Sequence, residues 1–91
     1  MTVAAERHKA RVRELCCVPC LLIFGDKHPC QAIHHLESIR DGLSDFLVIP
    51  ICQEMHQGAN GIHGLSRRGF ARRYGIDDWT LLAKTIELLG S

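Results

Sequence analysis

The chain has 91 residues, which is the length of one small domain and is too short for two domains, a barrel enzyme or a dinucleotide-binding fold. Apolar residues make up 46% of the sequence and charged residues 23%, so the composition is that of a globular protein and not of a disordered one. The formal net charge of +1 indicates no class of partner by itself.

The N-terminal segment is rich in charged residues and predicts a helix over residues 3–14. It lacks the apolar centre of a signal peptide, so we expect that the protein is not exported. No apolar run approaches the ~18 residues of a membrane span, so we also expect no membrane partner. Pro19 follows this segment and is expected to end any helix.

A β-hairpin is predicted around residues 20–36. The apolar run over residues 21–24 would be its first strand, Gly25 and Asp26 are a turn signal, and residues 31–36 would form the return strand.

The middle of the chain contains a second turn signal at Asp41 and Gly42. The apolar, β-branched run over residues 46–51 is interrupted by Pro50, so it is either a short edge strand or an extended entry into the next helix. Four glycines between residues 58 and 69 predict an irregular loop.

Two helices are predicted at the C-terminal end. Ser66 can cap a helix over about residues 67–74, which ends near Gly75, and Asp77 caps a last helix over about residues 78–89. The last helix is expected to bury one apolar face, which consists of Trp79, Leu82, Ala83, Ile86 and Leu89.

The helix over residues 67–74 carries a local group of arginines without an acid. These are Arg67, Arg68, Arg72 and Arg73. A basic group of this kind suits phosphate binding, and a solvated helix face is an equally good interpretation.

Five cysteines and six histidines are the most unusual feature of the sequence. An odd number of cysteines cannot all pair within one chain, and metal binding is the better interpretation without an export signal. Cys17 and Cys20 form a Cys-x2-Cys knuckle that can wrap a tetrahedral ion, and Cys52 and His56 stand four residues apart on one helical face. Buried, inert cysteines are the alternative.

His34 and His35 are adjacent at the end of the predicted return strand, where neighbouring side chains point to opposite faces. The imidazoles of His34, His56 and His63 could hold one divalent ion and leave open positions for a phosphate oxygen and water. His35 is then free to act as a general base, since an imidazole exchanges protons near neutral pH.

The order of these motifs resembles that of the HNH, or ββα-metal, nucleases, and especially the phage-type recombination-enhancement, RecA-dependent nuclease family. The shared features are Cys-x2-Cys, a His-His pair after a short hairpin, an Ile-Pro-Ile-Cys-x3-His run and Ile-His-Gly, over roughly residues 17–89. The resemblance implies an α+β fold with a small ββα-metal (His-Me finger) core, an N-terminal helix and two C-terminal helices. It implies one HNH-like nuclease domain over residues 1–91, with a core over about 16–64 and C-terminal helices over about 66–89.

Site roles also follow from the resemblance. His34 resembles the metal ligand, His35 the base, His56 the helix ligand and His63 the additional ligand of the phage-type branch. Mg²⁺ or another divalent ion would be the catalytic metal, and Zn²⁺ would be structural.

Two positions depart from the family's pattern. Met55 stands where the family has a zinc ligand, and a thioether is a poor Zn²⁺ ligand. The structural zinc would keep three cysteines, Cys17, Cys20 and Cys52. Its fourth ligand could be Cys16, His28 or Cys30, with Cys30 favoured because the hairpin would bring it near the knuckle. Leu47 replaces the family's central Asn, and the nearby Asp45 could take over its orienting role.

The activity that the resemblance implies is that of a metal-dependent DNA endonuclease in phage or bacterial recombination or repair, in the cytoplasm of a bacterial host cell. DNA would be the substrate, held at its phosphates by the arginine helix, and a RecA-type recombinase would be a further partner. One alternative is a catalytically silent zinc module that binds DNA or a recombination protein, which Met55 and Leu47 favour. Another is a small redox or disulfide protein, against which the odd number of cysteines speaks.

Overall fold

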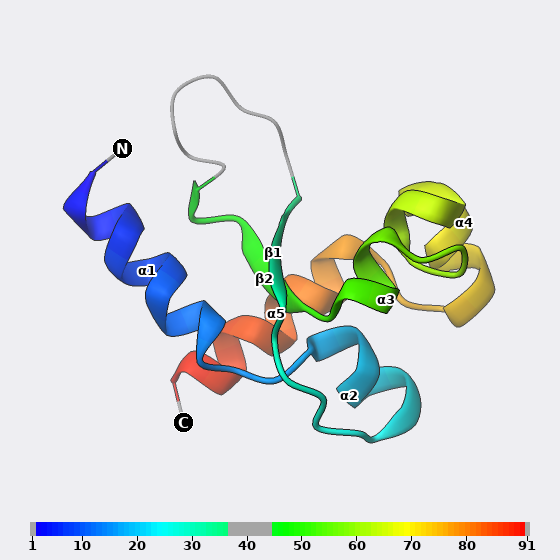
Figure 1. Cartoon of the computed structure of the whole chain (residues 1–91), viewed down its shortest axis with the longest axis horizontal. Coiled ribbons are helices and arrows are strands. Elements are labelled where there is room, and N and C mark those ends of the chain that lie inside the picture. Colours follow the sequence, from blue (N-terminus) through cyan, green and yellow to red (C-terminus); the bar gives the residue numbers. More distant parts are fainter. Residues whose placement is uncertain (1, 37–44, 91) are drawn as a thin grey trace.

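Helix α1 (Val3–Arg13) begins the chain and is capped by the side chain of Thr2, whose hydroxyl accepts a hydrogen bond from the amide of Ala5. The computed structural model describes residues 2–36 and 45–90 and shows a small mixed α+β domain with a two-stranded antiparallel sheet (Figure 1). The remaining elements, in chain order, are α2 (Val18–Phe24), β1 (Ala32–His35), β2 (Val48–Ile51), α3 (Gln53–Gln57), α4 (Ile62–Tyr74) and α5 (Asp78–Leu89).

The two strands pair in antiparallel fashion, with His34 opposite Ile49 and His35 opposite Val48. The apolar run around Pro50 is therefore a strand and not an extended entry into a helix. Pro50 is tolerated because both strands of a two-stranded sheet are edge strands, where a residue without an amide hydrogen can be accommodated. The predicted turn at Asp41 and Gly42 lies outside the described residues.

The predicted hairpin over residues 20–36 is wrong, because its first half is the helix α2. Pro19 lies in the first turn of α2, where its fixed φ angle favours a helix and its missing amide hydrogen costs nothing. Gly25 ends the helix with φ 71°, a conformation that glycine adopts without strain. β1 therefore takes β2 as its partner, much later in the chain.

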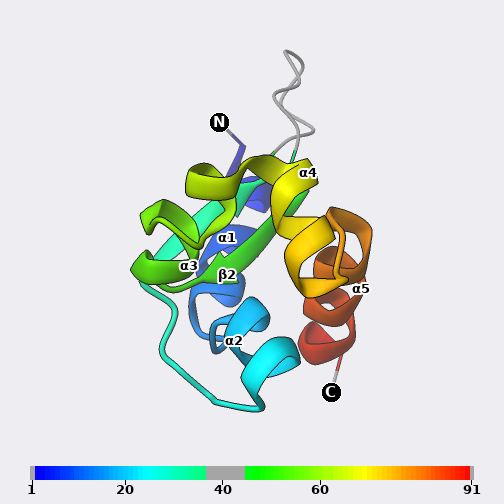
Figure 2. The same ribbon diagram turned by 90° about the vertical axis from the view of Figure 1, so that its right-hand side faces the viewer.

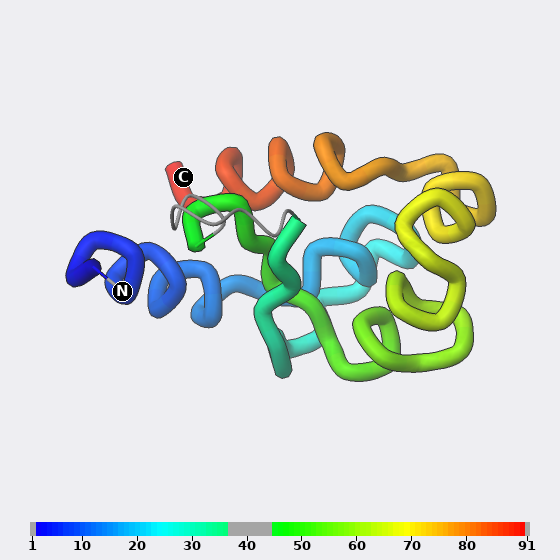
Figure 3. Tube along the Cα trace, turned by 90° about the horizontal axis from the view of Figure 1, so that it is seen from above, coloured from blue at the N-terminus to red at the C-terminus, as the bar shows by residue number. Residues whose placement is uncertain are grey.

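The core lies where three helices meet the sheet. β2 is buried along its whole length, and α1, α2 and α5 each contact it. Seen from above, α5 runs along one side of the molecule, behind the strands of Figure 1 (Figure 3). The large buried side chains include Ile49, Ile51, Ile62, Phe70 and Leu81.

Helices α3 and α4 pack on each other at the end of the molecule away from α1 (Figure 2). The predicted glycine-rich loop is shorter than expected, because α4 already begins at Ile62. Ser66 interrupts α4 with φ 67° and ψ 164°, and its hydroxyl accepts a hydrogen bond from the amide of Gly69. Ser66 thus caps the second part of α4, as its sequence position predicts.

Helix α5 has the predicted bounds and the predicted cap, since Asp77 accepts a hydrogen bond of 2.8 Å from the amide of Thr80. Its predicted buried face is confirmed at Leu82 and wrong at Trp79. Leu81, Leu82 and Thr85 are buried, whereas Trp79 is 65% exposed. The helix is apolar around much of its circumference, so periodicity alone does not define which side meets the core.

Within residues 2–36 and 45–90, none of the helices has the length and apolar character that crossing a bilayer requires.

Candidate metal centres

Three cysteines gather in the core at the junction of α2 with the strand–helix connection after β2. The sulfur atoms of Cys17, Cys20 and Cys52 all lie within 4.8 Å of one another, and all three residues are buried. Cys17 and Cys20 are brought together by the first turn of α2, and Cys52 is the N-terminal cap residue of α3. The three thiols are free and could hold a metal ion such as zinc.

Cys17, Cys20 and Cys52 are called the Cys group below. Burial is the main influence on the pKa values of Cys17 and Cys20. Removal from water raises the pKa of the Cys17 thiol and, more strongly, that of Cys20, where the neighbouring thiols act in the same direction. Cys17 and Cys20 are therefore held in the neutral form by themselves. A divalent cation reverses this preference, because thiolates are its ligands and its charge compensates theirs.

The structure does not bring Cys30 into the Cys group. Its thiol donates a hydrogen bond of 3.1 Å to the carbonyl oxygen of Ala32 at the start of β1. The expectation for Cys30 depended on the hairpin, and without the hairpin its reason is lost. A pocket of about 510 Å³ opens over Cys20 and Cys52 and is also lined by His28. His28, one of the alternatives for the fourth ligand, therefore lines the same pocket as two members of the Cys group.

Three histidines form a second group on the sheet and the two helices that follow it. The ring nitrogens of His34, His56 and His63 lie within 4.8 Å of one another, and the Nε2 atoms of His56 and His63 are 3.1 Å apart. His34 comes from β1, His56 from α3 and His63 from the first turn of α4. This His group contains the three imidazoles that the sequence predicts as ligands of one ion.

His34 shows that the His group fits a cation. Its Nε2 atom is buried and has no hydrogen-bond partner among the described residues. Burial, together with the nearby His56 and His63, lowers the pKa of His34 to about 4, and burial also lowers the pKa of His56. Both rings are therefore held neutral, which is the form in which imidazole binds a metal.

Two glycines allow the helices of the His group to approach closely. A Cβ atom on Gly61 would lie 2.4 Å from the carbonyl oxygen of Met55, and one on Gly64 would lie 2.4 Å from that of Gly58. Either contact would force the start of α4 away from α3. These glycines stand on both sides of His63 in the sequence, where they look like loop residues, and their role in bringing His56 close to His63 is visible only in the structure.

His35 lies outside the His group and on the other face of β1. Its side chain is 45% exposed, and its Nε2 atom is 3.5 Å from the Oδ1 atom of Asp45. The same carboxylate oxygen is 3.6 Å from the Nζ atom of Lys9, a buried residue of α1. Asp45 is thus positioned to orient the His35 ring, while α1 positions Asp45. Lys9 carries no signal of this role in the sequence, where it looks like an ordinary charged residue of an amphipathic helix.

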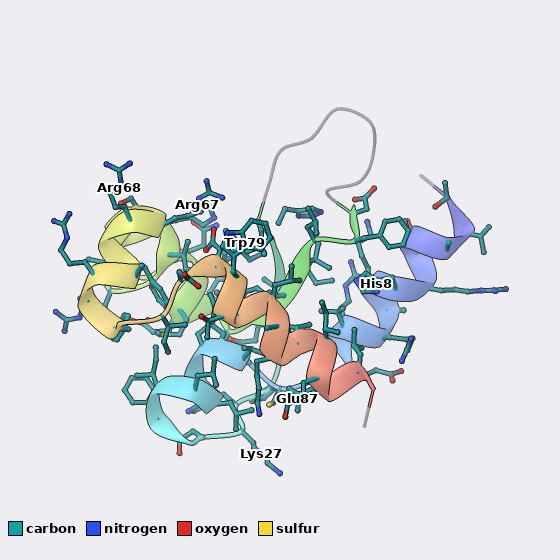
Figure 4. All side chains as sticks on the ribbon, turned by 180° about the vertical axis from the view of Figure 1, so that it is seen from behind. His8, Lys27, Arg67, Arg68, Trp79 and Glu87 are labelled. Atoms are coloured by element: carbon teal, nitrogen blue, oxygen red, sulfur yellow. The ribbon has the colours of Figure 1, made fainter. Side chains whose placement is uncertain are left out.

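Arg67, Arg68 and Arg73 do not line one common hollow. Arg67 donates a hydrogen bond to the carbonyl oxygen of Leu36 and forms an ion pair of 3.1 Å with Asp78. Arg73 lies over the ring of Tyr74 and lines the pocket beside the Cys group. Arg67 and Arg68 line a different hollow from Arg73, together with Trp79, and Figure 4 shows these three side chains on one side of the molecule.

The His group opens to solvent through a hollow of about 440 Å³. Its lining includes His34, His63, His35, Ser66 and Arg67. A ligand in this hollow would lie beside two members of the His group, His34 and His63, and beside His35 and Arg67. The arrangement suits an anionic oxygen, because a bound cation and Arg67 would both attract it.

The sequence matches no protein-family model, and no curated protein is significantly similar to it. Within residues 2–36 and 45–90, the protein is a mixed α+β domain in which two separate groups of side chains could each hold a metal ion.

Proposed function

We propose that the protein is a metal-dependent DNA endonuclease of the HNH, or ββα-metal, type, with a structural zinc at the Cys group and a catalytic divalent ion at the His group. The observation that carries the proposal is the His group itself. His34, His56 and His63 converge beside a hollow that His35 and Arg67 also line. The order β1, β2, α3 supports the proposal, because it supplies the two strands and the helix of a ββα core.

His34, His56 and His63 would hold a divalent ion, which would supply charge stabilisation to a phosphodiester during hydrolysis. His35 takes the proton from the attacking water, since it is the imidazole that stands next to the group without belonging to it. Asp45 orients the His35 ring, because a carboxylate beside Nε2 favours the proton on that atom and leaves Nδ1 to accept another. Arg67 binds a non-bridging phosphate oxygen.

Asp45 also bears on the missing central Asn. Leu47, which holds that position, is partly buried against the core, and its carbonyl oxygen accepts a hydrogen bond of 2.9 Å from the amide of Leu36. Its side chain can offer nothing to an imidazole. The carboxylate two residues earlier lies beside His35, so the orienting role has a candidate in this chain.

The direct test is nicking of supercoiled plasmid by the full chain with Mg²⁺ or Mn²⁺, with and without EDTA, alongside elemental analysis of the purified protein. We expect nicking that EDTA abolishes, and zinc that persists when loosely bound divalent ions are removed. His8→Ala is the matched control for substitutions in the His group. It removes the same kind of ring from α1, where His8 contacts the carbonyl oxygen of Phe46 and is not a member of the His group.

A protein that contains zinc and binds DNA, but nicks no plasmid with any divalent ion, would contradict the nuclease proposal. That outcome would favour a silent zinc module that binds DNA or a recombination protein. Recruitment by a RecA-type recombinase is part of the proposed biological setting and is tested by adding the recombinase to the same reaction.

A further inference from the structure

The one tryptophan of the chain stands in the wall of a pocket and not in the core. Trp79 is 65% exposed, and with Arg67 and Arg68 it lines a hollow of about 280 Å³. Figure 4 shows these three side chains on the same side of the molecule. An indole that contributes little to the core and borders a hollow with two guanidinium groups is a candidate for binding a flat ligand.

The chemistry of this Trp79 pocket suits a nucleobase. Leu36, Leu47 and Ala71 give it apolar walls, and the indole offers a face for stacking. The carboxylates of Asp77 and Asp78 also line it, and they can accept hydrogen bonds from the amino groups of a base. Its volume lies just below the ~300 Å³ at which pockets for drug-sized ligands begin, so it suits one planar ring system.

The Trp79 pocket adjoins the hollow over the His group. Arg67 and Leu36 line both of them. The hydrogen bond to the Leu36 carbonyl oxygen and the ion pair with Asp78 hold the Arg67 guanidinium between the two hollows. A nucleotide whose base lies against Trp79 would therefore have its sugar and phosphate near Arg67, next to the His group.

The structure gives Arg68 no hydrogen bond or ion pair with any residue in the described ranges 2–36 and 45–90, so its guanidinium is available to a ligand. Arg67 and Arg68 together supply positive charge along the rim, while Asp78 balances part of it. This combination of a stacking face with charge along its rim is typical of proteins that bind single strands.

We propose that the Trp79 pocket binds an unpaired base of the DNA strand and gives the protein a preference for single-stranded over duplex DNA. This inference rests on the proposed function, of which it specifies the substrate class. A base inside a duplex is stacked on both faces and cannot reach the indole, whereas an unpaired base can leave its neighbours at small cost. Stacking is tolerant of sequence, so the preference concerns strandedness and not base identity.

Trp79 is its own reporter, because every change in tryptophan fluorescence comes from it. The full chain carrying His35→Ala, which prevents cleavage of the probe, is titrated with an oligo(dT) strand. A separate titration uses a hairpin duplex with the same number of nucleotides. We expect saturable quenching by the single strand and little quenching at the same concentrations of duplex. Equal quenching by both, or quenching by neither, would overturn the proposal.

Substitution gives the second measurement, by anisotropy of a labelled oligo(dT) strand. Trp79→Ala should weaken single-strand binding about 5- to 150-fold, the range of alanine substitutions at stacking residues. Trp79→Phe should recover most of the affinity, because a phenyl ring still stacks. Ile86→Ala is the matched control, since Ile86 is the other strongly exposed large apolar residue of α5, at 59%. Trp79→Ala binding as tightly as the parent would overturn the proposal.

The two proposals fail separately. Absence of nicking with intact, Trp79-dependent binding of single strands would remove the nuclease activity and leave the base pocket. Metal-dependent nicking that Trp79→Ala leaves unchanged, together with unchanged affinity for single strands, would remove the pocket and leave the activity.

Discussion

The Cys group and the His group are both sets of three ligands, yet their surroundings differ. All three cysteines are buried, whereas the His group passes from the buried His34 through the partly buried His56 to the exposed His63. Helix α3 joins the two groups, because Cys52 caps its N-terminus and His56 lies one turn later. One short helix thus contributes a residue to a buried set of ligands at its start and a residue to a partly exposed set one turn later.

The same difference separates structural from catalytic metal sites in general. Structural sites are closed by protein ligands, and catalytic sites keep a position for water or substrate. The Cys group ties α2 to the segment that leads from β2 into α3, so an ion there connects parts of the core. His34 and His63 of the His group line a hollow together with His35 and Arg67, so an ion there would be accessible to a ligand.

The largest effect is expected when the Cys group is broken. Cys52→Ser should abolish the cooperative thermal transition, because structural zinc contributes on the order of 10 kcal/mol in small domains. Circular dichroism during heating, with zinc content measured on the same sample, checks this. Cys30→Ser is the matched control, since the Cys30 thiol donates its hydrogen bond to the carbonyl oxygen of Ala32 and lies outside the group. Unchanged melting in a strong chelator would show that the Cys group holds no structural ion.

The next largest effect concerns the His group. His56→Ala should lose nicking together with the second ion, because the two remaining imidazoles hold an ion poorly. The variant should keep zinc and the cooperative melting transition. Elemental analysis, melting and plasmid nicking are measured together, with His8→Ala as the control that keeps all three. If His56→Ala also loses zinc, the two groups are not independent and the comparison between them fails.

His35 sharpens the distinction between a ligand and a base. His35→Ala should reduce nicking about 10²- to 10⁴-fold, the usual contribution of a positioned proton acceptor, and should keep both ions. Asp45→Asn should give a smaller loss of the same kind, because it weakens the orientation of the ring without removing it. Rates of nicking at saturating metal, compared with metal content, separate the two. A loss of activity that follows loss of the second ion would make His35 a ligand.

The arginines of α4 test which side of the molecule meets DNA. Arg68 lines the Trp79 pocket, which adjoins the hollow over the His group. Arg73 lines the pocket beside the Cys group. Arg68→Gln should reduce the slope of log affinity against log salt by about 0.7 for a single strand, as expected for one lost phosphate contact. Arg73→Gln should leave the slope unchanged. Equal reductions for the two variants would mean that DNA covers both sides of α4.

Local features of the fold were predictable from the sequence. Asp77, Ser66 and Gly75 end or begin helices through contacts within a few residues, so their positions alone identify them. The hairpin was not predictable in the same way. An apolar run as short as that over residues 21–24 suits a strand or a helix equally well, and the partner of β1 is chosen by distant residues.

The candidate sites divide along the same line. His34 and His35 could be assigned to different faces because alternation along a strand is a local property. Cys30 could not be placed, because its location depended on which strand would pair with which. Trp79 appeared to belong to the core, since an apolar residue on an apolar helix carries no sign of exposure until the neighbouring helices are known.

The break in α4 at Ser66 means that part of this helix stores conformational strain. Its φ of 67° with ψ of 164° is a region that residues with a Cβ atom occupy at a cost of about 1–3 kcal/mol. Ser66→Gly removes that cost and keeps most of the capping preference, so a slightly higher melting temperature is expected. Ser66 stands between His63 and Arg67 in the sequence. A glycine at this position would make the backbone more flexible and would hold these two side chains less firmly in their relative positions. A gain in melting temperature accompanied by a fall in nicking would identify the bend as a place where stability has been given up to hold a geometry.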